Sequence, residues 1–569
     1  MAAQENGVEE ESSETSPLLH QTASPPINSA AGVAPNGSTD ATVTAAEDGG
    51  TIERQFTDEG RQKQYEGIPE IRKKMPYIMP ALGIGVFMGA ADQTLIVSSY
   101  GRIGSELNAL SSTSWIATAY FLTLTSFQPL YGKMSDIFSR KSCLLFAYAI
   151  FGLGCLWCGL APTMMHLILA RAFAGIGGGG MTTVVSIFLS DAVPLRERGK
   201  WQGYVNIIFA VGGATGAPLG GFLVDSIGWR WAFLGQVPLC FIAFIAVYFV
   251  MRLPKKEDEH WKAKLKRIDF LGAVLLLAAV VLLLVGMDRG SNVSWKATIT
   301  IVCLCVSIPL FAILVFVEMK IASEPFAPGH IIFERSLFAC YLANFFSFCG
   351  WMATLFYVPL KFQAVDGYSP TQAGLRVIPA VIAAVSGSLF GGFYMSKTGK
   401  YYWITVLCYS VVIIGTLLVL LFSGIVMQSE VGIMCGLFIS GFGNGIGVTT
   451  TLIGLIANAS RNDQAIATAC SYLFRSLGST MGVSLSAAVA NQVLRTQLTK
   501  KLRNGQDAAE IAERVRESLS YLDKLSPNVR ELVRKCYDRS VQAAFGLQIG
   551  LVTGAFVSAW FIREKALSK

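Results

Sequence analysis

Two charged residues, Asp92 and Arg171, stand inside apolar runs that are long enough to cross a lipid bilayer. A charge in that setting is costly and usually functional. Burial favours the uncharged form of a carboxylic acid, so Asp92 can take up and release a proton. Arg171, at the start of a glycine-rich stretch, can assist that exchange or hold a bound solute. The competing interpretation of Asp92 is a neutral, hydrogen-bonded structural residue.

A short charged segment, residues 132–141, separates two apolar runs and carries Gly132, Asp136, Arg140 and Lys141. We expect Gly132 to permit a tight turn. Asp136 can accept hydrogen bonds from the N-terminus of a neighbouring helix and pair with Arg140, within a basic cluster at the membrane surface. Such a pair can latch the two halves of the molecule in one state and release them in another. Alternatively, the segment is a solvated turn.

A third pattern is a run of glycines around a proline, in the order Gly212, Gly216, Pro218, Gly220 and Gly221. Glycines spaced along one face of a helix allow a close neighbour. The proline removes a backbone hydrogen bond and bends the helix. A bent, closely packed helix suits a rocking element between two helix bundles, whereas simple core packing is the alternative.

Four further polar residues within apolar runs could line a cavity: Gln128, Asn344, Asn444 and Arg475. Arg475 is a second cation inside a span, a position that normally faces a cavity or a carboxylate. The three amide side chains could equally form hydrogen bonds with neighbouring helices, which leaves their part in a cavity open.

Residues for catalysis, metal binding or nucleotide binding are not apparent in the sequence. It shows no Ser-His-Asp set or metal-ligand spacing, and we interpret Cys155 and Cys158 as packing residues of an apolar helix. The glycines at 175–180 are not followed by the Lys-Ser/Thr pair of a phosphate loop. We therefore expect no enzyme activity, no cofactor and no metal.

The elements that position these residues follow from the composition. The chain of 569 residues is 52% hydrophobic and 15% charged, with a mean hydropathy of +0.49, whereas a soluble protein carries about 25% charged residues. A spanning helix needs roughly 20 apolar residues. About fourteen such runs start near residues 75, 112, 142, 166, 201, 231, 270, 297, 336, 371, 402, 431, 465 and 541. They predict an all-α membrane protein.

Loops and tails indicate the orientation. Residues 1–74 lack a signal-peptide pattern and are too polar to bury a core, so we expect them to be disordered. Lys and Arg gather in loops after even-numbered spans, including Arg196, Lys200 and Lys397, so the positive-inside rule places these loops and both termini in the cytosol. The net charge of +8 therefore reports orientation and not nucleic-acid binding. Residues 491–540 are expected to form a long loop of amphipathic helices, with a break at Pro527, on the lumenal or external side.

Several segments together resemble one family. They are residues 92–94, residues 115–120, the segment 132–141, the Arg171 segment, residues 216–221, residues 229–233, residues 362–370 and residues 463–465. Over about residues 75–562 the chain is similar to the fourteen-span drug:proton antiporter branch of the major facilitator superfamily. One departure is Ala217, which separates Gly216 from Pro218 where the family motif usually has glycine next to proline.

The resemblance implies two six-helix bundles with two extra spans inserted between them, about 14 transmembrane helices, and alternating access around a site near the membrane midplane. The expected segments are a cytosolic tail at 1–74, the first bundle at 75–252, a cytosolic linker at 253–267, the inserted spans at 268–320, the second bundle with its long loop at 321–562, and a cytosolic tail at 563–569.

This branch contains drug exporters, siderophore exporters and fungal vacuolar transporters of basic amino acids. Glu14, Leu18 and Leu19 fit an acidic dileucine signal in an exposed tail that a sorting adaptor complex could bind. Together with the overall similarity, the signal favours proton-coupled antiport of lysine, arginine or histidine from the cytosol into the vacuole. A plasma-membrane exporter of drugs or toxins is the main alternative. A non-transporting sensor would be expected to lose the intramembrane charges, which this chain keeps.

Replacement of Leu18 and Leu19 by Ala tests the sorting signal. The tail cannot fold alone, so the double variant should keep the stability of the unaltered protein and lose only an adaptor-binding pair. Fluorescence imaging should show part of the double variant at the cell surface and the unaltered protein at the vacuole. An unchanged vacuolar location of the double variant would support the vacuolar membrane as the location and contradict the dileucine signal.

Overall fold

The computed structural model describes residues 69–96, 103, 106–107, 114–251, 269–292, 295–322, 325, 328–368, 370–501 and 525–567. Within these residues the secondary structure is helical, apart from one isolated bridge between Ser423 and Gln428. The sorting residues Glu14, Leu18 and Leu19 and the expected linker at 253–267 lie outside the described residues.

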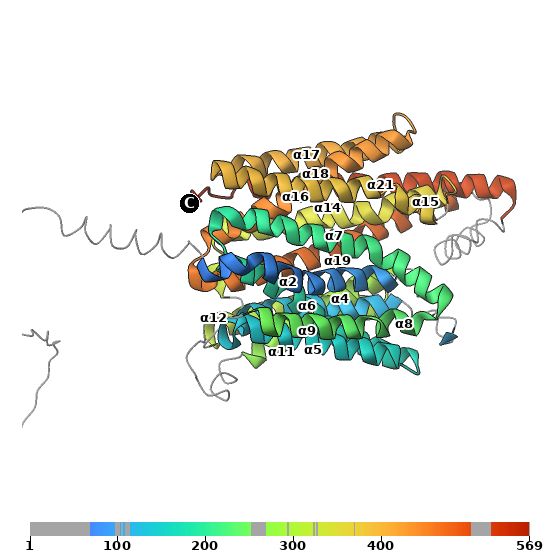
Figure 1. Cartoon of the computed structure of the whole chain (residues 1–569). Coiled ribbons are helices and arrows are strands. Elements are labelled where there is room, and N and C mark those ends of the chain that lie inside the picture. Colours follow the sequence, from blue (N-terminus) through green and yellow to red (C-terminus); the bar gives the residue numbers. More distant parts are fainter. Residues whose placement is uncertain are drawn as a thin grey trace, which may run out of the picture. The chain divides into compact units, whose positions relative to one another are not determined.

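The first group of helices occupies the lower half of Figure 1, with α7 crossing toward the upper half. These helices are α2 (Pro69–Leu95), α4 (Ser114–Phe138), α5 (Arg140–Gly159), α6 (Met164–Ala192), α7 (Leu195–Ser226), α8 (Trp229–Leu234) and α9 (Gln236–Val250). Helix α2 begins at Pro69, within the segment expected to be a disordered tail, because proline is well suited to the first turn of a helix.

The second group contains six long helices, most of them in the upper half of Figure 1. They are α14 (Arg335–Ala364), α16 (Ile378–Thr398), α17 (Tyr402–Phe422), α18 (Glu430–Asn458), α19 (Gln464–Lys501) and α21 (Pro527–Ala559), with the short elements α13 (Gly329–Ile332), α15 (Pro370–Leu375) and η3 (Arg461–Asp463) between them. Two inserted helices, α11 (Phe270–Asn292) and α12 (Thr298–Lys320), join the groups.

The segment 491–540, expected to be a long loop of amphipathic helices, is helical in its described parts. Residues 491–501 continue α19, and residues 527–540 form the first turns of α21. A helix satisfies its backbone groups internally, so these polar residues can continue the two helices past the apolar layer. Pro527, expected to break a helix, starts one instead, at a position where its missing N–H costs nothing.

The polarity of the helices depends on what they face. Twelve helices in the described part are long and apolar enough to span a membrane. The helices α4 and α19, of 25 and 38 residues, are long enough to span a membrane, but their most apolar stretches are less apolar than those of the other twelve. With them, the described part has fourteen long helices. Both pack against each other and against further helices. Neighbouring helices therefore shield α4 and α19 from lipid, which lets them carry polar residues.

Local signals set several helix ends. Ser139 has a φ of 102°, separates α4 from α5, and accepts a hydrogen bond from the Ser142 backbone N–H. Gly399 ends α16 with a φ of 70°, a conformation that favours glycine. Ser429 caps α18 by accepting from the Gly432 N–H. These caps hold the short connections between neighbouring spans.

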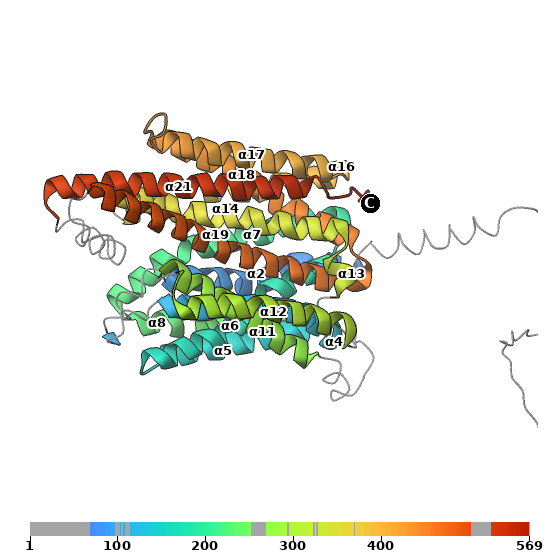
Figure 2. The ribbon, with the colours of Figure 1, turned by 180° about the vertical axis from the view of Figure 1, so that it is seen from behind.

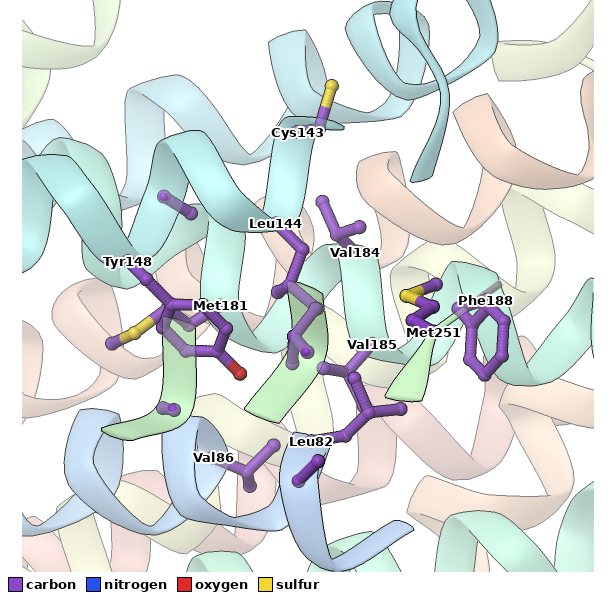
Figure 3. Close-up of a cluster of buried hydrophobic side chains, with 14 of the residues drawn as sticks. Leu82, Val86, Cys143, Leu144, Tyr148, Met181, Val184, Val185, Phe188 and Met251 are labelled. Carbon is purple, nitrogen blue, oxygen red and sulfur yellow. The ribbon is translucent and has the colours of Figure 1, made fainter. Parts of the chain in front are cut away.

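The interior of the first bundle is packed with apolar side chains from several helices (Figure 3). Leu82 and Val86 of α2 lie among Leu144 of α5 and Val184 and Val185 of α6, and all five are buried. Because lipid tails are as apolar as these side chains, close packing, not removal from water, holds such helices together. This packing makes the first bundle a firm support for the charged residues it carries.

We define the basic end of the molecule as the end where the helix connections at 138–140, 192–195, 398–402 and 458–464 lie, and the other end as the opposite end. The two bundles meet in the basic half. A Cβ at Gly392 of α16 would collide with the backbone oxygen of Gly199 of α7. Asn206 of α7 also donates to the Ser388 hydroxyl of α16 at 2.8 Å, about 15 Å from the basic end, so the contact extends to the middle of the membrane. The bundles are therefore closed against each other at the basic end.

The inserted helices lie over the seam between the bundles (Figure 2). Helix α11 contacts both α4 and α19. One apolar cluster joins Leu130 of α4, Leu276 and Leu284 of α11, Leu314 of α12 and Leu473 of α19. The inserted pair thus belongs to neither bundle alone and covers one side of their junction.

The structure contradicts the expected position of Gly132 in a tight turn. It lies inside α4 and not in a turn. A Cβ added at this position would be 2.7 Å from the Cβ of Ala469 and 3.2 Å from the backbone oxygen of Ala465, both in the second bundle. Gly132 therefore permits the close approach of α4 and α19 where the bundles meet.

Gly132→Ala should open the basic end, because overpacking a tight contact typically costs 1–3 kcal/mol. Cysteines introduced at Asn206 and Ser388 report the closed state by forming a disulfide, in a background where the exposed Cys305 and Cys435 are replaced by Ser. Gly132→Ala should lower the crosslinking yield severalfold. Gly213→Ala is the matched control, because a Cβ there meets nothing within 4 Å. Equal yields in the two variants would contradict this role of Gly132.

Candidate functional site

Asp92 and Arg171 form a buried ion pair within the first bundle. Nη1 of Arg171 lies 2.8 Å from Oδ2 and 3.0 Å from Oδ1 of Asp92. The Asp92 side chain is 0% exposed and that of Arg171 is 1% exposed. The sequence predicted both charges inside spans, and the structure brings them together from α2 and α6.

The pair lies toward the opposite end of the molecule. Asp92 is three residues from the end of α2 and Arg171 is seven residues from the start of α6, which at 1.5 Å per residue is about 5 Å and about 10 Å. Both residues therefore lie closer to the opposite end than to the basic end.

Three neighbours hold the pair in place. Gln236, the first residue of α9, donates to Oδ1 of Asp92 at 3.2 Å. Nε of Arg171 donates to the backbone oxygen of Ile116 at 3.3 Å, and its guanidinium carbon lies 4.2 Å from the ring centre of Tyr120. Gln236 was not predicted from the sequence, although an amide at the start of an apolar run is a signal of the same kind as Asp92.

The glycine face of α7 packs on α2 beside Asp92. A Cβ at Gly212 would be 2.5 Å from the backbone oxygen of Phe87, and a Cβ at Gly216 would collide with the backbone oxygen of Ala91. Gly220 is also buried, whereas Pro218 lies inside α7 and is exposed. The expected rocking helix therefore touches the chain directly next to the proton-exchange candidate.

The charged segment at the basic end ties three helices of the first bundle together. Arg140 of α5 lies 2.6 Å from Asp136 of α4 and 2.8 Å from Asp191 of α6. Lys141 donates to the backbone oxygen of Tyr248 at 2.6 Å. The predicted Asp136–Arg140 pair is present, and Asp191 is a third member that the sequence did not reveal.

A second polar group surrounds Arg475 of α19. Its Nε donates to Oδ1 of Asn344 at 3.1 Å, and its Nη2 donates to the backbone oxygen of Val448 at 3.0 Å. Thr451 donates to the same Oδ1 at 3.1 Å, and the Asn344 amide donates to Ser471 at 3.3 Å. Arg475 and Asn344, both cavity candidates in the sequence, are thus direct partners.

The other two cavity candidates lie near this group. The hydroxyl of Ser347 on α14 donates to Oδ1 of Asn444 at 2.6 Å. Gln128 of α4 accepts from Ser476, the residue after Arg475, at 3.0 Å. Gln128 therefore joins the two bundles, while Asn444 joins two helices of the second bundle.

Further polar contacts cross between the bundles and were not predicted. Ser186 of α6 lies 2.5 Å from the hydroxyl of Tyr472 of α19 and donates to Gln202 of α7 at 3.2 Å. Gln202 donates to Asn206, whose amide reaches Ser388 of α16. Each of these residues is small or neutral within its span, so hydropathy does not distinguish it from packing residues. Together they form a polar chain across the closed junction.

Comparison with known proteins identifies the family. A sequence model described as Major Facilitator Superfamily matches residues 82–483, more than half of the chain. The chain belongs to this superfamily. Its members are transporters, so the chain is a membrane transporter of a small-molecule substrate and not an enzyme.

Three curated relatives are similar over most of their length. The vacuolar membrane amino acid uptake transporter fnx2 of Schizosaccharomyces pombe is 39% identical over 86% of this chain and 84% of that protein. Multidrug resistance protein fnx1 of the same yeast is 37% identical over 85% and 91%. Vacuolar basic amino acid transporter 2 of Saccharomyces cerevisiae is 34% identical over 76% and 94%. The expected resemblance to fungal vacuolar transporters is confirmed.

A solved structure shows the same fold. The human organic anion transporter MFSD10 superposes with a TM-score of 0.56 at 12% identity, covering 86% of this chain and all of that chain. The likeness concerns fold alone. It confirms the major facilitator fold predicted from the sequence, to which the inserted helices α11 and α12 are added here.

A double-mutant cycle tests the buried pair. Asp92→Asn leaves the Arg171 charge buried without its partner and should cost roughly 3–5 kcal/mol. Arg171→Met should cost a similar amount by exposing the carboxylate to an apolar surrounding. The double variant should recover most of the loss, because both charges are gone. Thermal unfolding of the purified proteins measures this, and strictly additive losses would contradict direct pairing.

Proposed function

We propose that this protein is a proton-coupled antiporter that moves the basic amino acids lysine, arginine and histidine from the cytosol into the vacuole. The observation that carries the proposal is the buried Asp92–Arg171 pair in a chain 39% identical to a protein named as a vacuolar membrane amino acid uptake transporter. The similarity to vacuolar basic amino acid transporter 2 supports the choice of basic substrates.

Asp92 is the proposed proton carrier. A proton bound to its carboxylate would cancel the charge that holds Arg171, so the ion pair would loosen. Gln236 would still offer its amide to the neutral acid. Since the pair lies nearer the opposite end, a proton from an acidic compartment on that side would have the shorter distance to travel to Asp92. Loss of the proton would restore the pair.

The proposed orientation places the basic end in the cytosol, as the positive-inside rule predicts. The structure is then closed toward the cytosol by the contacts of Gly199 with Gly392 and of Asn206 with Ser388. Alternating access requires these contacts to break while the opposite end closes. The Asp136–Arg140–Asp191 group would keep α4, α5 and α6 moving as one body during this change.

Helix α7 is the proposed mechanical link between proton exchange and the cytosolic gate. Its residues Gly212 and Gly216 pack on α2 beside Asp92, and its residues Gly199 and Asn206 contact α16. A change in the position of α2 therefore acts on the same rigid helix that closes the basic end. This continuity supports coupling between the two events.

The proposed location is the vacuolar membrane, which the names of two relatives support. Residues Glu14, Leu18 and Leu19 would be recognised by a sorting adaptor complex in the cytosol. The alternative is a plasma-membrane exporter of drugs or toxins, which is favoured by the 37% identity to multidrug resistance protein fnx1. Location and substrate together separate the two proposals.

Uptake of labelled lysine into isolated vacuolar vesicles tests the function. Vesicles with the unaltered protein should accumulate lysine when their interior is acidic, and a protonophore should abolish this uptake. Asp92→Asn should remove at least about nine-tenths of the gradient-driven uptake, because it keeps the volume but cannot titrate. Asp92→Glu is the matched control and should retain part of the activity.

Because Asp92→Asn also lowers stability, uptake is divided by the amount of each variant in the vacuolar membrane, measured by immunoblot. Undiminished gradient-driven uptake by Asp92→Asn would contradict the assignment of Asp92 as the proton carrier. Vesicles that take up no lysine, arginine or histidine, from cells that become drug-sensitive without the protein, would favour the exporter.

A further inference from the structure

Arg475 is a buried cation whose partners are neutral. Its side chain is 6% exposed and its two hydrogen-bonded acceptors are the amide oxygen of Asn344 and the backbone oxygen of Val448. Its guanidinium carbon also lies 5.5 Å from the ring centre of Phe348 and 5.2 Å from that of Tyr472. None of these groups carries a negative charge to balance the arginine.

Two other buried cations of the described residues have carboxylate partners. Arg171 pairs with Asp92 at 2.8 Å. Lys361, near the end of α14, lies 3.3 Å from Asp366 and 4.0 Å from Asp538 of α21. Arg198, in the first turn of α7 at the basic end, donates to the backbone oxygen of Val193 and to the amide oxygen of Gln464. Among the described carboxylates, none forms an ion pair with Arg475, which lies deeper in the membrane than Arg198.

The depth of Arg475 matches the middle of a membrane. Arg475 is 11 residues from the start of α19, Asn344 is 9 from the start of α14, and Val448 is 10 from the end of α18. At 1.5 Å per residue, the three lie about 14–17 Å from the basic end. A hydrocarbon layer is about 30 Å thick, so this group lies near its midplane.

Arg475 also lies beside the face of α19 that meets the first bundle. Tyr472 contacts Ser186 of α6, and Ser476 contacts Gln128 of α4. Residues three and four apart in a helix share a face, so Arg475 lies at the edge of the contact zone between the bundles. In transporters of this kind, substrates bind near the midplane where the repeats meet.

Unused donors remain in this group. A guanidinium has five N–H groups, and the two bonds from Arg475 leave its Nη1 without an acceptor among the described residues. The Oδ1 of Asn444 accepts from Ser347, which leaves the Asn444 amide N–H groups without an acceptor in the same part of the chain. Val448, whose backbone oxygen accepts from Arg475, is one helical turn from Asn444 on α18. These N–H groups of Arg475 and of Asn444 therefore lie on one side of the second bundle.

We propose that Arg475 binds the carboxylate of the transported solute at the midplane, with the amide of Asn444 as a second donor. The inference that this solute is an amino acid rests on the proposed function. A guanidinium matches a carboxylate through two parallel N–H donors, and the bound anion supplies the counter-charge that the protein omits. The solute thereby completes an ion pair that the empty protein lacks.

This arrangement determines selectivity. A lysine molecule offers a carboxylate to Arg475, whereas cadaverine, which is lysine without the carboxylate, offers only cations. A buried, uncompensated arginine repels such a cation instead of binding it. Amines and cationic drugs without an acid group should therefore be poor substrates, which separates the amino acid transporter from an exporter of cationic drugs.

Ligand-induced thermal stabilisation of the purified, full-length protein tests the proposal without requiring transport. The probes are lysine, arginine and histidine with their carboxylate-free counterparts cadaverine, agmatine and histamine, and a panel of other amino acids. In the unaltered protein each effective amino acid should bind at least about tenfold more tightly than its decarboxylated counterpart, since one charge-assisted pair contributes about 1.5–3 kcal/mol. Competition for labelled lysine uptake should follow the same order.

Arg475→Gln should remove the preference for the carboxylate, and Arg475→Lys, which keeps the charge but loses the paired donors, should retain part of it. Lys500→Gln is the control, because it removes a positive charge from an exposed position of the same helix and should behave as the unaltered protein. Unchanged unfolding temperatures without ligand would show that each variant folds. Should Arg475→Gln unfold early, the intact Arg475→Lys variant and the amine series still decide the outcome.

The possible results distinguish this inference from the proposed function. Arg475-dependent binding of acidic or neutral amino acids only would overturn basic substrates and keep the carboxylate site. Lysine binding that cadaverine matches, or that Arg475→Gln leaves at full strength, would overturn the carboxylate site and keep basic amino acid transport. Binding of no carboxylate in the panel would overturn both.

Discussion

The interior of a bilayer offers no water to solvate charge, so a charged side chain within a span needs compensation inside the protein. This constraint explains where the charged and polar residues of the described helices lie. Asp92 and Arg171 neutralise each other at the opposite end of the first bundle. The two most polar long helices, α4 and α19, face each other where neighbours shield them from lipid. Arg475 lies on the second of these, about 17 Å along α19 from the basic end.

Helix α7 connects events that occur at different depths. Its glycine face follows α2 past Asp92, and its first turns meet α16 at the basic end. Both contacts use glycine at the point of closest approach, so a small displacement of one helix cannot be absorbed by side chains and is passed on as backbone movement. In the proposed mechanism, these two closely packed contacts on one helix would couple the proton site at Asp92 to the gate at the basic end.

The number of spans and the charges inside them could be predicted from the sequence, because hydropathy and the cost of intramembrane charge depend on local composition. The partners could not be predicted. Gln236 reaches Asp92, and Asn344 reaches Arg475, across 144 and 131 positions of the chain. Gly132 was assigned to a turn because charged neighbours resemble a loop, yet α4 continues to Phe138 and ends only where Ser139 adopts a positive φ. Residues near a membrane surface can be helical and charged at once.

The inserted helices make the transporter asymmetric about its own junction. With α11 resting on α4 and α19 at once, separation of the bundles along that seam must shear the leucine-rich contact that includes Leu276 and Leu284. The flank formed by α7 and α16 has no such cover from α11 or α12 among the described helices. The inserted pair therefore covers one flank of the junction from the surrounding lipid, while α7 and α16 close the other flank by direct contact. The two extra spans therefore shield a single flank of the junction between the bundles.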